Sequence, residues 1–266
     1  MCKAIKISID DLDYDLFSII VKEYKRNPIP YAYVYYDMIY ELDKTHIIFK
    51  ISNRRILGYI LLWRGMKPYA IHVYGDVEGL LDKSILEHEA IVHVPPELNE
   101  SATVLLRKYG DLKFMGIFLD MLADSSSFLP YFPDKAIRLG KEHVKDYTML
   151  KKEQGIVLSE DEAFDRLIKW RYYGVYYEGK LVSIACAYLR LPEIWIIGDV
   201  YTLKEYRGRG YAKIVTSAIT RDAIYCSGKA LLHVREDNIS AIRVYSRLGY
   251  RIIGKKYWYL FKPYLI

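Results

Sequence analysis

The sequence predicts an α+β fold (α/β mixed) that is duplicated in tandem, and three observations support this. Strand-like and helix-like hydrophobic patterns alternate in both halves of the chain. A segment rich in serine and proline separates the halves, and short sequence marks recur in the same order on either side of it. The length of 266 residues fits two domains of modest size, and 52% hydrophobic residues supply a core for each.

The expected domain boundary lies near the middle of the chain. Residues 125–127 are three serines, and Pro130 and Pro133 follow them between two stretches of strong apolar periodicity. We therefore predict a first lobe at residues 1–124, a linker at 125–135 and a second lobe at 136–266.

Short apolar stretches predict strands in both lobes. Those of the first lobe lie at 47–51, 56–63 and 70–74. Those of the second lobe lie at 136–139, 172–177, 181–189, 195–202, 230–234, 250–253 and 257–261. The stretch 181–189 is nearly all apolar, which is typical of a strand covered on both faces.

Two helices are predicted from apolar periodicity in the second lobe, besides helical patterns that run up to Trp170. After Gly210, apolar residues with a 3.6-residue period form one face: Tyr211, Ile214, Val215, Ala218 and Ile219. A further helix opens at Asn238 and ends at Gly249.

Recurring marks predict the duplication. A histidine, an asparagine and a glycine follow one another as His93, Asn99 and Gly110 in the first lobe and as His233, Asn238 and Gly249 in the second. The Gly-Asp-Val at 75–77 also echoes the one at 198–200. The first lobe lacks the Arg-Gly-Arg-Gly of residues 207–210, so we expect only the second lobe to bind the ligand of that loop.

Composition and charge limit the partners. The formal net charge of +6 favours anionic partners, but no block of five or six like charges occurs, and a solvated basic surface is the ordinary explanation. Nucleic acid is therefore not the expected partner. One glutamine and four asparagines beside many charged residues give a thermophile-like composition.

We expect a cytoplasmic protein with no membrane span, no disulfide framework and no metal site. The three cysteines form no Cys-x-x-Cys pair, and the histidines show no metal-binding spacing with them. No stretch approaches about 18 consecutive apolar residues, and residues 1–10 lack the apolar block of a signal peptide. Cys186 lies within a predicted strand and is expected to be a small core residue.

The loop at residues 207–212 has the chemistry of a phosphate site. It lies between a strand and an amphipathic helix, so its backbone N–H groups include the unpaired donors of a helix N-terminus. Small residues let a ligand approach the backbone, and basic residues add positive charge. The residues expected to bind the cofactor here are Arg207, Gly208, Arg209, Gly210, Tyr211 and Ala212.

Two known phosphate motifs do not fit this loop, and a third does. The P-loop pattern is absent, and Lys213 stands where a Rossmann turn needs its third glycine. Arg207, Gly210 and Ala212 match the pattern [RQ]-x-x-G-x-[GA] of the GNAT N-acetyltransferase superfamily. A basic, glycine-containing loop that only caps a helix remains the alternative for this match taken alone.

The second lobe resembles the GNAT superfamily beyond this loop. The family also has Asn-x-x-Ala-x-x-x-Tyr-x-x-x-Gly-[FY], and every position is matched by Asn238, Ala241, Tyr245, Gly249 and Tyr250. The resemblance covers residues 136–263. It implies the acyl-CoA N-acyltransferase (GNAT) fold, a mixed, twisted sheet flanked by helices and splayed at one point, with acetyl-CoA or another acyl-CoA as co-substrate.

The resemblance also implies roles for single residues. The backbone N–H of Val200 would polarise the thioester carbonyl, and the backbone of Thr202 would pair with the pantetheine arm. Asn238 would contact the cofactor or cap a helix, and the two roles are compatible.

Tyr245 falls at the family's tyrosine, whose hydroxyl protonates the departing thiolate. A tyrosine on an apolar helical face is more commonly a core residue, but the equivalent position in the first lobe is Leu106, which keeps the packing and drops the hydroxyl.

The general base is less defined. Some family members carry a glutamate three residues before the Asp of the Gly-Asp-Val, where this chain has Ile196. Others carry one five residues before the Asn, where His233 stands, and an imidazole can accept a proton from an ammonium group. His93 at nearly the same place in the first lobe favours a structural role instead. Asp199 and Glu193 are weaker candidates, and an acceptor that arrives deprotonated needs no base.

The sequence therefore predicts an N-acetyltransferase that moves acetyl from acetyl-CoA to a primary amine by direct attack in a ternary complex. The first lobe would form one wall of the acceptor site, and the acceptor amine is not identified. Two alternatives remain: a non-catalytic module that binds acyl-CoA, and an acyltransferase associated with nucleic acid.

Overall fold

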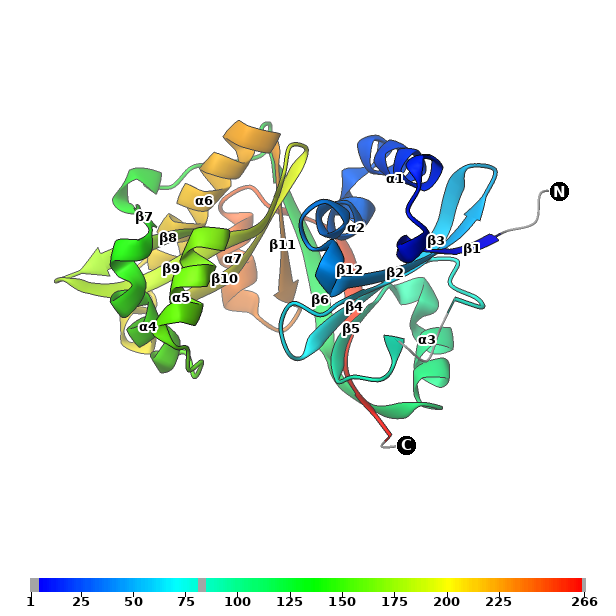
Figure 1. The fold of residues 1–266 in the computed structure, drawn as a ribbon. Coiled ribbons are helices and arrows are strands. Elements are labelled where there is room, and N and C mark those ends of the chain that lie inside the picture. Colours follow the sequence, from blue (N-terminus) through cyan, green and yellow to red (C-terminus); the bar gives the residue numbers. More distant parts are fainter. Residues whose placement is uncertain (1–4, 81–84, 265–266) are drawn as a thin grey trace. The chain divides into compact units, whose positions relative to one another are not determined.

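A computed structural model describes residues 5–80 and 85–264 and shows two units, each built on a sheet with helices (Figure 1). One unit comprises Met1–Leu119 with Lys255–Ile266, and the other comprises Asp120–Gly254. Two strands, β6 (Gly110–Asp124) and β12 (Arg251–Pro263), contribute residues to both units. These bounds differ from the linear division at 125–135, and the domain assignment made from sequence stays a prediction.

The first unit has the strand order β1-β2-β3-β4-β5-β12. Its neighbouring strands are antiparallel except for the parallel pair β4–β5. Its elements, besides β12 and residues 110–119 of β6, are β1 (Ile5–Ser8), α1 (Tyr14–Arg26), α2 (Pro28–Tyr40), β2 (Thr45–Ser52), β3 (Arg55–Trp63), β4 (Tyr69–Gly75), β5 (Ala90–Val94) and α3 (Asn99–Leu106).

The second unit has the strand order β7-β8-β9-β10-β11, with β6 as the next neighbour of β11. The pair β10–β11 is parallel, and β7–β8, β8–β9 and β9–β10 are antiparallel. Its elements are β7 (Ile137–Leu139), α4 (Val144–Glu153), α5 (Glu160–Lys169), β8 (Arg171–Tyr177), β9 (Lys180–Leu191), β10 (Ile194–Thr202), α6 (Tyr211–Ser227), β11 (Lys229–Arg235) and α7 (Ile239–Ser246).

The order of elements repeats, which agrees with the predicted duplication. Each unit runs from a short strand through two helices to three antiparallel strands, a parallel strand and a short helix, and among the described residues only the second unit has a helix, α6, before its parallel strand. In the parallel pairs, Tyr69 lies opposite Ala90 and Trp195 lies opposite Ala230. His93 and His233 each come three residues after that alanine, so the two histidines are equivalent.

The two Gly-Asp-Val sequences, at 75–77 and 198–200, were expected to be equivalent, but they do not occupy equivalent positions on β4 and β10. Counted from the paired Tyr69 and Trp195, Gly198 of β10 corresponds to His72 of β4, and Gly75 comes three residues later. The strand β4 pairs with β3 without a register shift, whereas β10 carries shifts against β9. The two Gly-Asp-Val sequences therefore occupy different places in their sheets.

Helices cover both faces of the sheet in the second unit. Tyr172 and Tyr173 are successive on β8, so their side chains point to opposite faces. The Tyr172 hydroxyl bonds Tyr147 of α4, and the Tyr173 hydroxyl bonds Asp222 of α6. Figure 1 accordingly shows α4 and α6 on opposite sides of β8–β10. The buried run 181–187 of β9 confirms that this strand is covered on both faces.

One predicted strand boundary is wrong. Residues 250–253 and 257–261 were expected to form two strands, but β12 runs unbroken from Arg251 to Pro263. Gly254 interrupts the apolar pattern without adopting a positive φ, so the extended backbone continues through it.

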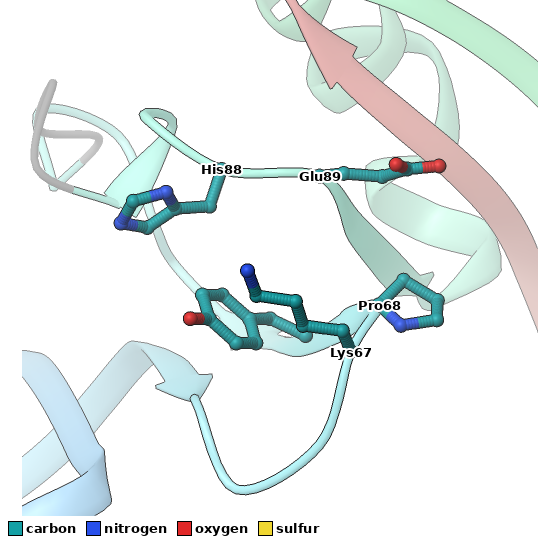
Figure 2. A pocket seen from close by; sticks show the side chains of 5 residues that line it. Lys67, Pro68, His88 and Glu89 are labelled. Carbon is teal, nitrogen blue, oxygen red and sulfur yellow. The ribbon is translucent and has the colours of Figure 1, made fainter.

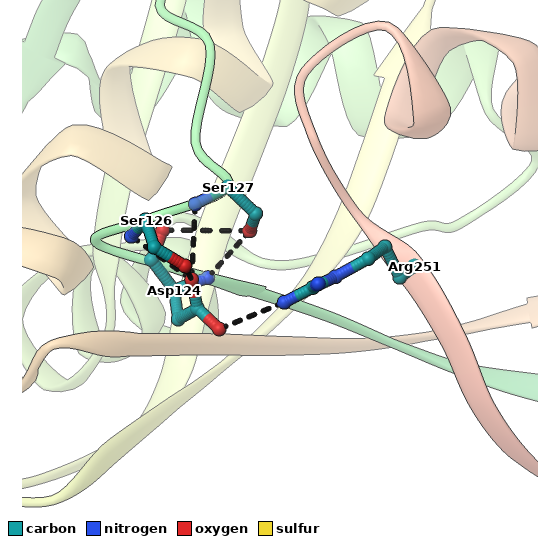
Figure 3. Close-up of polar contacts among 4 residues, drawn as sticks. All are labelled: Asp124, Ser126, Ser127 and Arg251. Atoms are coloured by element: carbon teal, nitrogen blue, oxygen red, sulfur yellow. Dashed lines mark hydrogen bonds and ion pairs between the residues drawn. The ribbon is translucent and has the colours of Figure 1, made fainter.

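The serine-rich segment after β6 is tied to the second unit (Figure 3). The Asp124 carboxylate accepts hydrogen bonds from the backbone N–H groups of Ser126 and Ser127, at 2.9 and 3.0 Å, and from the Arg251 guanidinium at 3.0 Å. Gly249 has φ +91°, and a Cβ there would lie 1.8 Å from the Ser127 carbonyl oxygen. The predicted linker is thus held closely against the turn that ends α7.

Candidate functional site

The ladder between β10 and β11 ends inside the second unit. The paired residues stop at Ile197 and Leu232, while β10 continues its pairing with β9 as far as Thr202. The resemblance implied a sheet splayed at one point, and the pairing of β10 with β11 ends after Ile197 and Leu232. Among the described residues, β10 beyond Ile197 is not paired with β11 in this ladder.

A β-bulge follows directly on β10. Gly198 pairs with Cys186 and Tyr201 with Ile184, so Asp199 and Val200 together stand opposite a single residue of β9. Asp199 has φ +48°, a left-handed conformation that is uncommon outside glycine. A bulge re-aims the backbone locally, and here it re-aims the peptide groups around Val200.

Buried polar side chains hold the bulge from one face of the sheet. Lys151 of α4 is 1% exposed, and its Nζ donates to both carboxylate oxygens of Asp199 at 2.8 and 2.9 Å. The Tyr172 hydroxyl and the Gln154 amide donate to the same carboxylate, at 2.8 and 3.2 Å. Asp199 is therefore an anchor with its acceptor capacity in use, which does not suit the role of base considered for it.

The end of β10 is fixed to its neighbours. The Thr202 hydroxyl lies 2.8 Å from that of Ser183 on β9, and the Thr202 carbonyl accepts a hydrogen bond from Arg207 Nε at 3.1 Å. The Arg207 guanidinium also lies 5.8 Å from the Tyr201 ring centroid. Arg207 thus connects the loop to the strand that precedes it.

The predicted phosphate loop opens α6. Gly208 and Gly210 have φ +77° and +86°, which explains the two glycines. Gly210 is the N-cap, and the first helical hydrogen bond runs from the Ile214 N–H to the Gly210 carbonyl. Glycine has no side chain to cap the first turn, so the N–H groups of residues 211–213 are suited to an anion.

Aromatic rings surround the basic side chains of this loop. The Arg209 guanidinium lies 5.8 Å from the Tyr177 ring centroid and 5.4 Å from that of Tyr206. Lys213 Nζ lies 3.3 Å from the centroid of Tyr131, whose backbone N–H is bonded to Ser217 of α6. Tyr131 belongs to the predicted linker, and no sequence pattern indicated its place beside the loop.

Asn238 is the N-cap of α7, as one of its two expected roles required. Its side-chain oxygen accepts the backbone N–H of Ala241 at 3.1 Å. Its contact with a cofactor stays a prediction.

Tyr245 lies on the buried face of α7 and is 7% exposed. Burial raises the pKa of its hydroxyl to about 12. Its ring lies 6.0 Å from that of Tyr250, and within the described residues its hydroxyl has no hydrogen-bond partner. In the first unit Leu106 is buried at the end of the equivalent helix α3. Tyr245 is therefore a protonated phenol with its hydrogen-bonding capacity unused.

His233 lies on β11, one residue beyond the last pair with β10. Its Nδ1 lies 2.6 Å from Oδ1 of Asp120 on β6, and the side chains are 8% and 10% exposed. Ile196, at the other position considered for a base, is fully buried. Asp120 was missed from sequence, although an acid within the apolar run 115–123 was a possible signal.

The remaining expectations concern Cys186, metal binding and membrane-spanning helices. Cys186 is 1% exposed and burial raises the pKa of its thiol, which confirms its place in the core. In the described residues no group of three or more His, Cys, Asp or Glu side chains is arranged to hold a metal ion. No helix of the described ranges is long and apolar enough to cross a membrane.

A pocket of about 380 Å³ lies in the first unit (Figure 2). It is lined by Lys67, Pro68, Tyr69, His88 and Glu89. Tyr69 and Ala90 begin the parallel strands β4 and β5, so the pocket lies at their amino ends. In the second unit the loop follows the carboxyl end of β10, which is the end where open sheets of this kind place ligands.

Part of this chain is similar to a known family. Residues 172–259 match the family model of FR47-like proteins. A probable spermine N(1)-acetyltransferase of Bacillus subtilis subsp. natto is 32% identical over 93 residues, and a spermine/spermidine N(1)-acetyltransferase of Bacillus subtilis is 33% identical over 94. Each match takes in 31% of this chain, and the chain spans 60% of the length of each of these relatives.

Solved structures resemble all or most of the chain. A Drosophila protein superposes with a TM-score of 0.71 at 12% identity, over 99% of both chains. A tandem GNAT protein from the clavulanic acid biosynthesis pathway superposes with a TM-score of 0.59 at 12% identity, over 97% of this chain and 98% of that one. A GNAT-family protein of Novosphingobium aromaticivorans gives 0.54 at 23% identity, over 73% and 84%. These likenesses confirm the predicted fold, in its two-lobed form.

Proposed function

We propose that this two-lobed protein of the GNAT fold is an N-acetyltransferase that transfers acetyl from acetyl-CoA to a primary amine. The observation that carries the proposal is the uncapped, glycine-containing start of α6, which follows the bulged end of β10. A diphosphate needs convergent N–H donors and positive charge, and this loop supplies both. The net charge of +6 is consistent with an anionic co-substrate.

The residues present fit such a co-substrate. The backbone of residues 207–212 would hold the diphosphate, with Arg209 and Lys213 adding charge. A Cβ built at Gly208 meets no atom within 4 Å, so the space above this turn is open to a ligand. The backbone of Thr202 would pair with the pantetheine arm, in the stretch of β10 that β11 leaves unpaired. Bound acetyl-CoA supplies an activated acyl thioester.

Three groups of this chain would then divide the chemistry. The backbone N–H of Val200 would stabilise the negative charge that develops on the acyl carbonyl oxygen when the amine attacks. The Tyr245 hydroxyl would give its proton to the leaving sulfur, and the amine would lose its proton to His233 Nε2 or to water. One C–N bond forms, one C–S bond breaks, and one proton moves at each end of the reaction.

The acceptor is proposed as a primary amine, and spermidine is the first compound to test. The support is the name of the two Bacillus subtilis relatives, whose matched segments cover 31% of this chain. The positive net charge gives no general attraction for a polycation, so specificity for a polyamine would need local acidic groups.

Release of free CoA thiol, measured with acetyl-CoA and a panel of amines, tests the activity. The panel should contain spermidine, spermine, a lysine peptide and a simple alkylamine. Amine-dependent release above the hydrolysis rate supports the proposal. Tight binding of acetyl-CoA without release for any amine would favour the non-catalytic alternative. Salt-sensitive binding of nucleic acid would favour the other alternative, an acyltransferase associated with nucleic acid.

We also propose a cytoplasmic location and high thermal stability. Cys186 and Cys226 are both free, which suits a reducing compartment. The scarcity of asparagine and glutamine suits a heat-stable protein. A melting temperature above about 90 °C would support the second point, and one in the usual range of 45–65 °C would contradict it.

A further inference from the structure

One buried polar contact on β11 joins two residues that lie 113 positions apart in sequence. Asp120 is a buried residue, and its Oδ1 lies 2.6 Å from His233 Nδ1. An ionised carboxylate only accepts hydrogen bonds, so the shared proton belongs to Nδ1. In the neutral ring, Nε2 then carries the lone pair.

The first unit provides a natural comparison, because its equivalent histidine has different partners. His93 lies opposite Trp258 on β12, with ring centroids 4.0 Å apart. Its Nδ1 lies 3.1 Å from Nδ1 of His72, and the two rings meet edge to face. Trp258 stacks in turn on Phe118 at 3.7 Å. The histidine of the unit without the glycine-containing loop is therefore part of an aromatic stack.

In the unit that carries the loop, the histidine contacts an acid at 2.6 Å, whereas the contacts described above for His93 are with aromatic rings. Packing explains His93, which is surrounded by rings. Packing does not explain why the adjacent strand places a buried carboxylate against His233. Burying a charged carboxylate is costly in free energy unless a partner is hydrogen-bonded to it. The two histidines, which occupy equivalent places in sequence and register, therefore have different surroundings.

We propose that Asp120 is a positioning residue, which holds the proton on His233 Nδ1 and so presents His233 Nε2 as the acceptor for the proton of the substrate ammonium. This inference rests on the proposed function. As the ammonium loses its proton, Nε2 gains it and the ring becomes an imidazolium. The Asp120 carboxylate offsets that charge, and the proton then leaves Nε2 to water.

The first test measures the tautomer and does not depend on activity. In protein labelled with 15N-histidine, the ring-nitrogen shifts of His233 should show a protonated Nδ1 and an unprotonated Nε2 at a pH where the ring is neutral. The Asp120→Leu variant should lose this preference and approach the mixture of a free imidazole. A His233 ring with its proton on Nε2 in the native protein overturns the proposal, whatever the protein catalyses.

The second test is a double-mutant cycle on acetyl transfer to the most active amine of the panel. His233→Ala should lower kcat/KM by about 10²–10⁴-fold, as expected for loss of a general base. Asp120→Asn should lower it by about tenfold or more, and the double variant should be no slower than His233→Ala alone. Additive losses in the cycle would show a structural role for Asp120 and overturn the proposal.

Controls from the same chain keep these losses interpretable. Asp124→Asn changes a carboxylate on the same strand and should leave kcat/KM within about twofold, and so should His93→Gln in the other unit. Acetyl-CoA affinity should stay unchanged in Asp120→Asn. The losses in His233→Ala and Asp120→Asn should also shrink above about pH 9, because more of the amine arrives deprotonated. A wild-type protein that binds acetyl-CoA but acetylates no amine refutes the proposed function, while the tautomer still decides the role of Asp120.

Discussion

Lys151 Nζ lies 2.8 and 2.9 Å from the two carboxylate oxygens of Asp199, and this pair connects α4 to the bulge of β10. Lys151 is 1% exposed, so nearly all of its ammonium hydration has been replaced by protein partners. Tyr172 and Gln154 complete the set of donors around the carboxylate. The consequence is a backbone conformation at Asp199, with φ +48°, that buried side chains hold in place.

Lys151→Met should destabilise the protein and disturb the site together. Removing one partner of a buried pair costs about 3–5 kcal/mol, because Asp199 keeps its charge without its main partner. Urea unfolding measures the loss. The matched control is Lys152→Met, on the same helix but exposed, which should change stability by less than about 0.5 kcal/mol. The double variant Lys151→Met with Asp199→Asn should recover part of the loss, and no recovery would contradict the account.

Tyr245→Phe should slow turnover by about 10²–10⁴-fold and leave acetyl-CoA affinity unchanged. The physical reason is that the variant keeps the buried ring and removes only the proton that the thiolate would receive. Steady-state kinetics and equilibrium binding together measure the split. Tyr225→Phe, at a tyrosine that is 91% exposed on α6, is the control and should be neutral. Full activity in Tyr245→Phe would remove the acid role.

Stability should fall in alkaline solution because of buried tyrosines. Burial raises the pKa of Tyr245 to about 12 and holds those of Tyr172 and Tyr250 well above the usual value. The folded state then binds these protons more tightly than the unfolded chain, whose tyrosines titrate near 10. Stability is therefore complete below pH 10 and is lost as pH rises through the folded-state values, by about 1.4 kcal/mol per pH unit for each such group.

Unfolding free energies at pH 8, 9, 10 and 11 measure this dependence. Tyr245→Phe should remove one group's share of the slope above pH 10, and Tyr225→Phe should not. A stability that stays flat to pH 11 would show that these phenols are exposed in solution.

Much of the second unit could be predicted from sequence because its signals are local. The helix after Gly210 and the cap at Asn238 depend on residues a few positions apart, and both are confirmed. Asp120 and Lys151 could not be found in this way. Their partners, His233 and Asp199, lie 113 and 48 residues away and meet only through strand order and helix packing.

One failed expectation and one contact that the sequence did not indicate have a physical basis as well. The Gly-Asp-Val echo is a three-residue match, and so short a match does not fix the place of a segment along its strand: Gly198 comes three residues after the paired Trp195, whereas Gly75 comes six after the paired Tyr69. Tyr131 was assigned to a linker because serine and proline surround it, yet the backbone bond to Ser217 brings its ring beside Lys213. Composition describes how a segment behaves alone and says little about the surface on which it packs.

The measurement that tests the central claim most directly is equilibrium dialysis of labelled acetyl-CoA against the native protein, Gly208→Ala and Gly228→Ala. The two glycines have φ +77° and +73°, and a Cβ at either meets nothing within 4 Å, so both variants carry the same backbone strain at opposite ends of α6. We predict saturable binding by the native protein and by Gly228→Ala. In Gly208→Ala the added methyl group would stand in the space assigned to the diphosphate. If it displaces one charge-assisted hydrogen bond to the ligand, binding should weaken by about 10- to 150-fold. Native protein that does not bind acetyl-CoA, or equal affinity in all three proteins, would contradict the account.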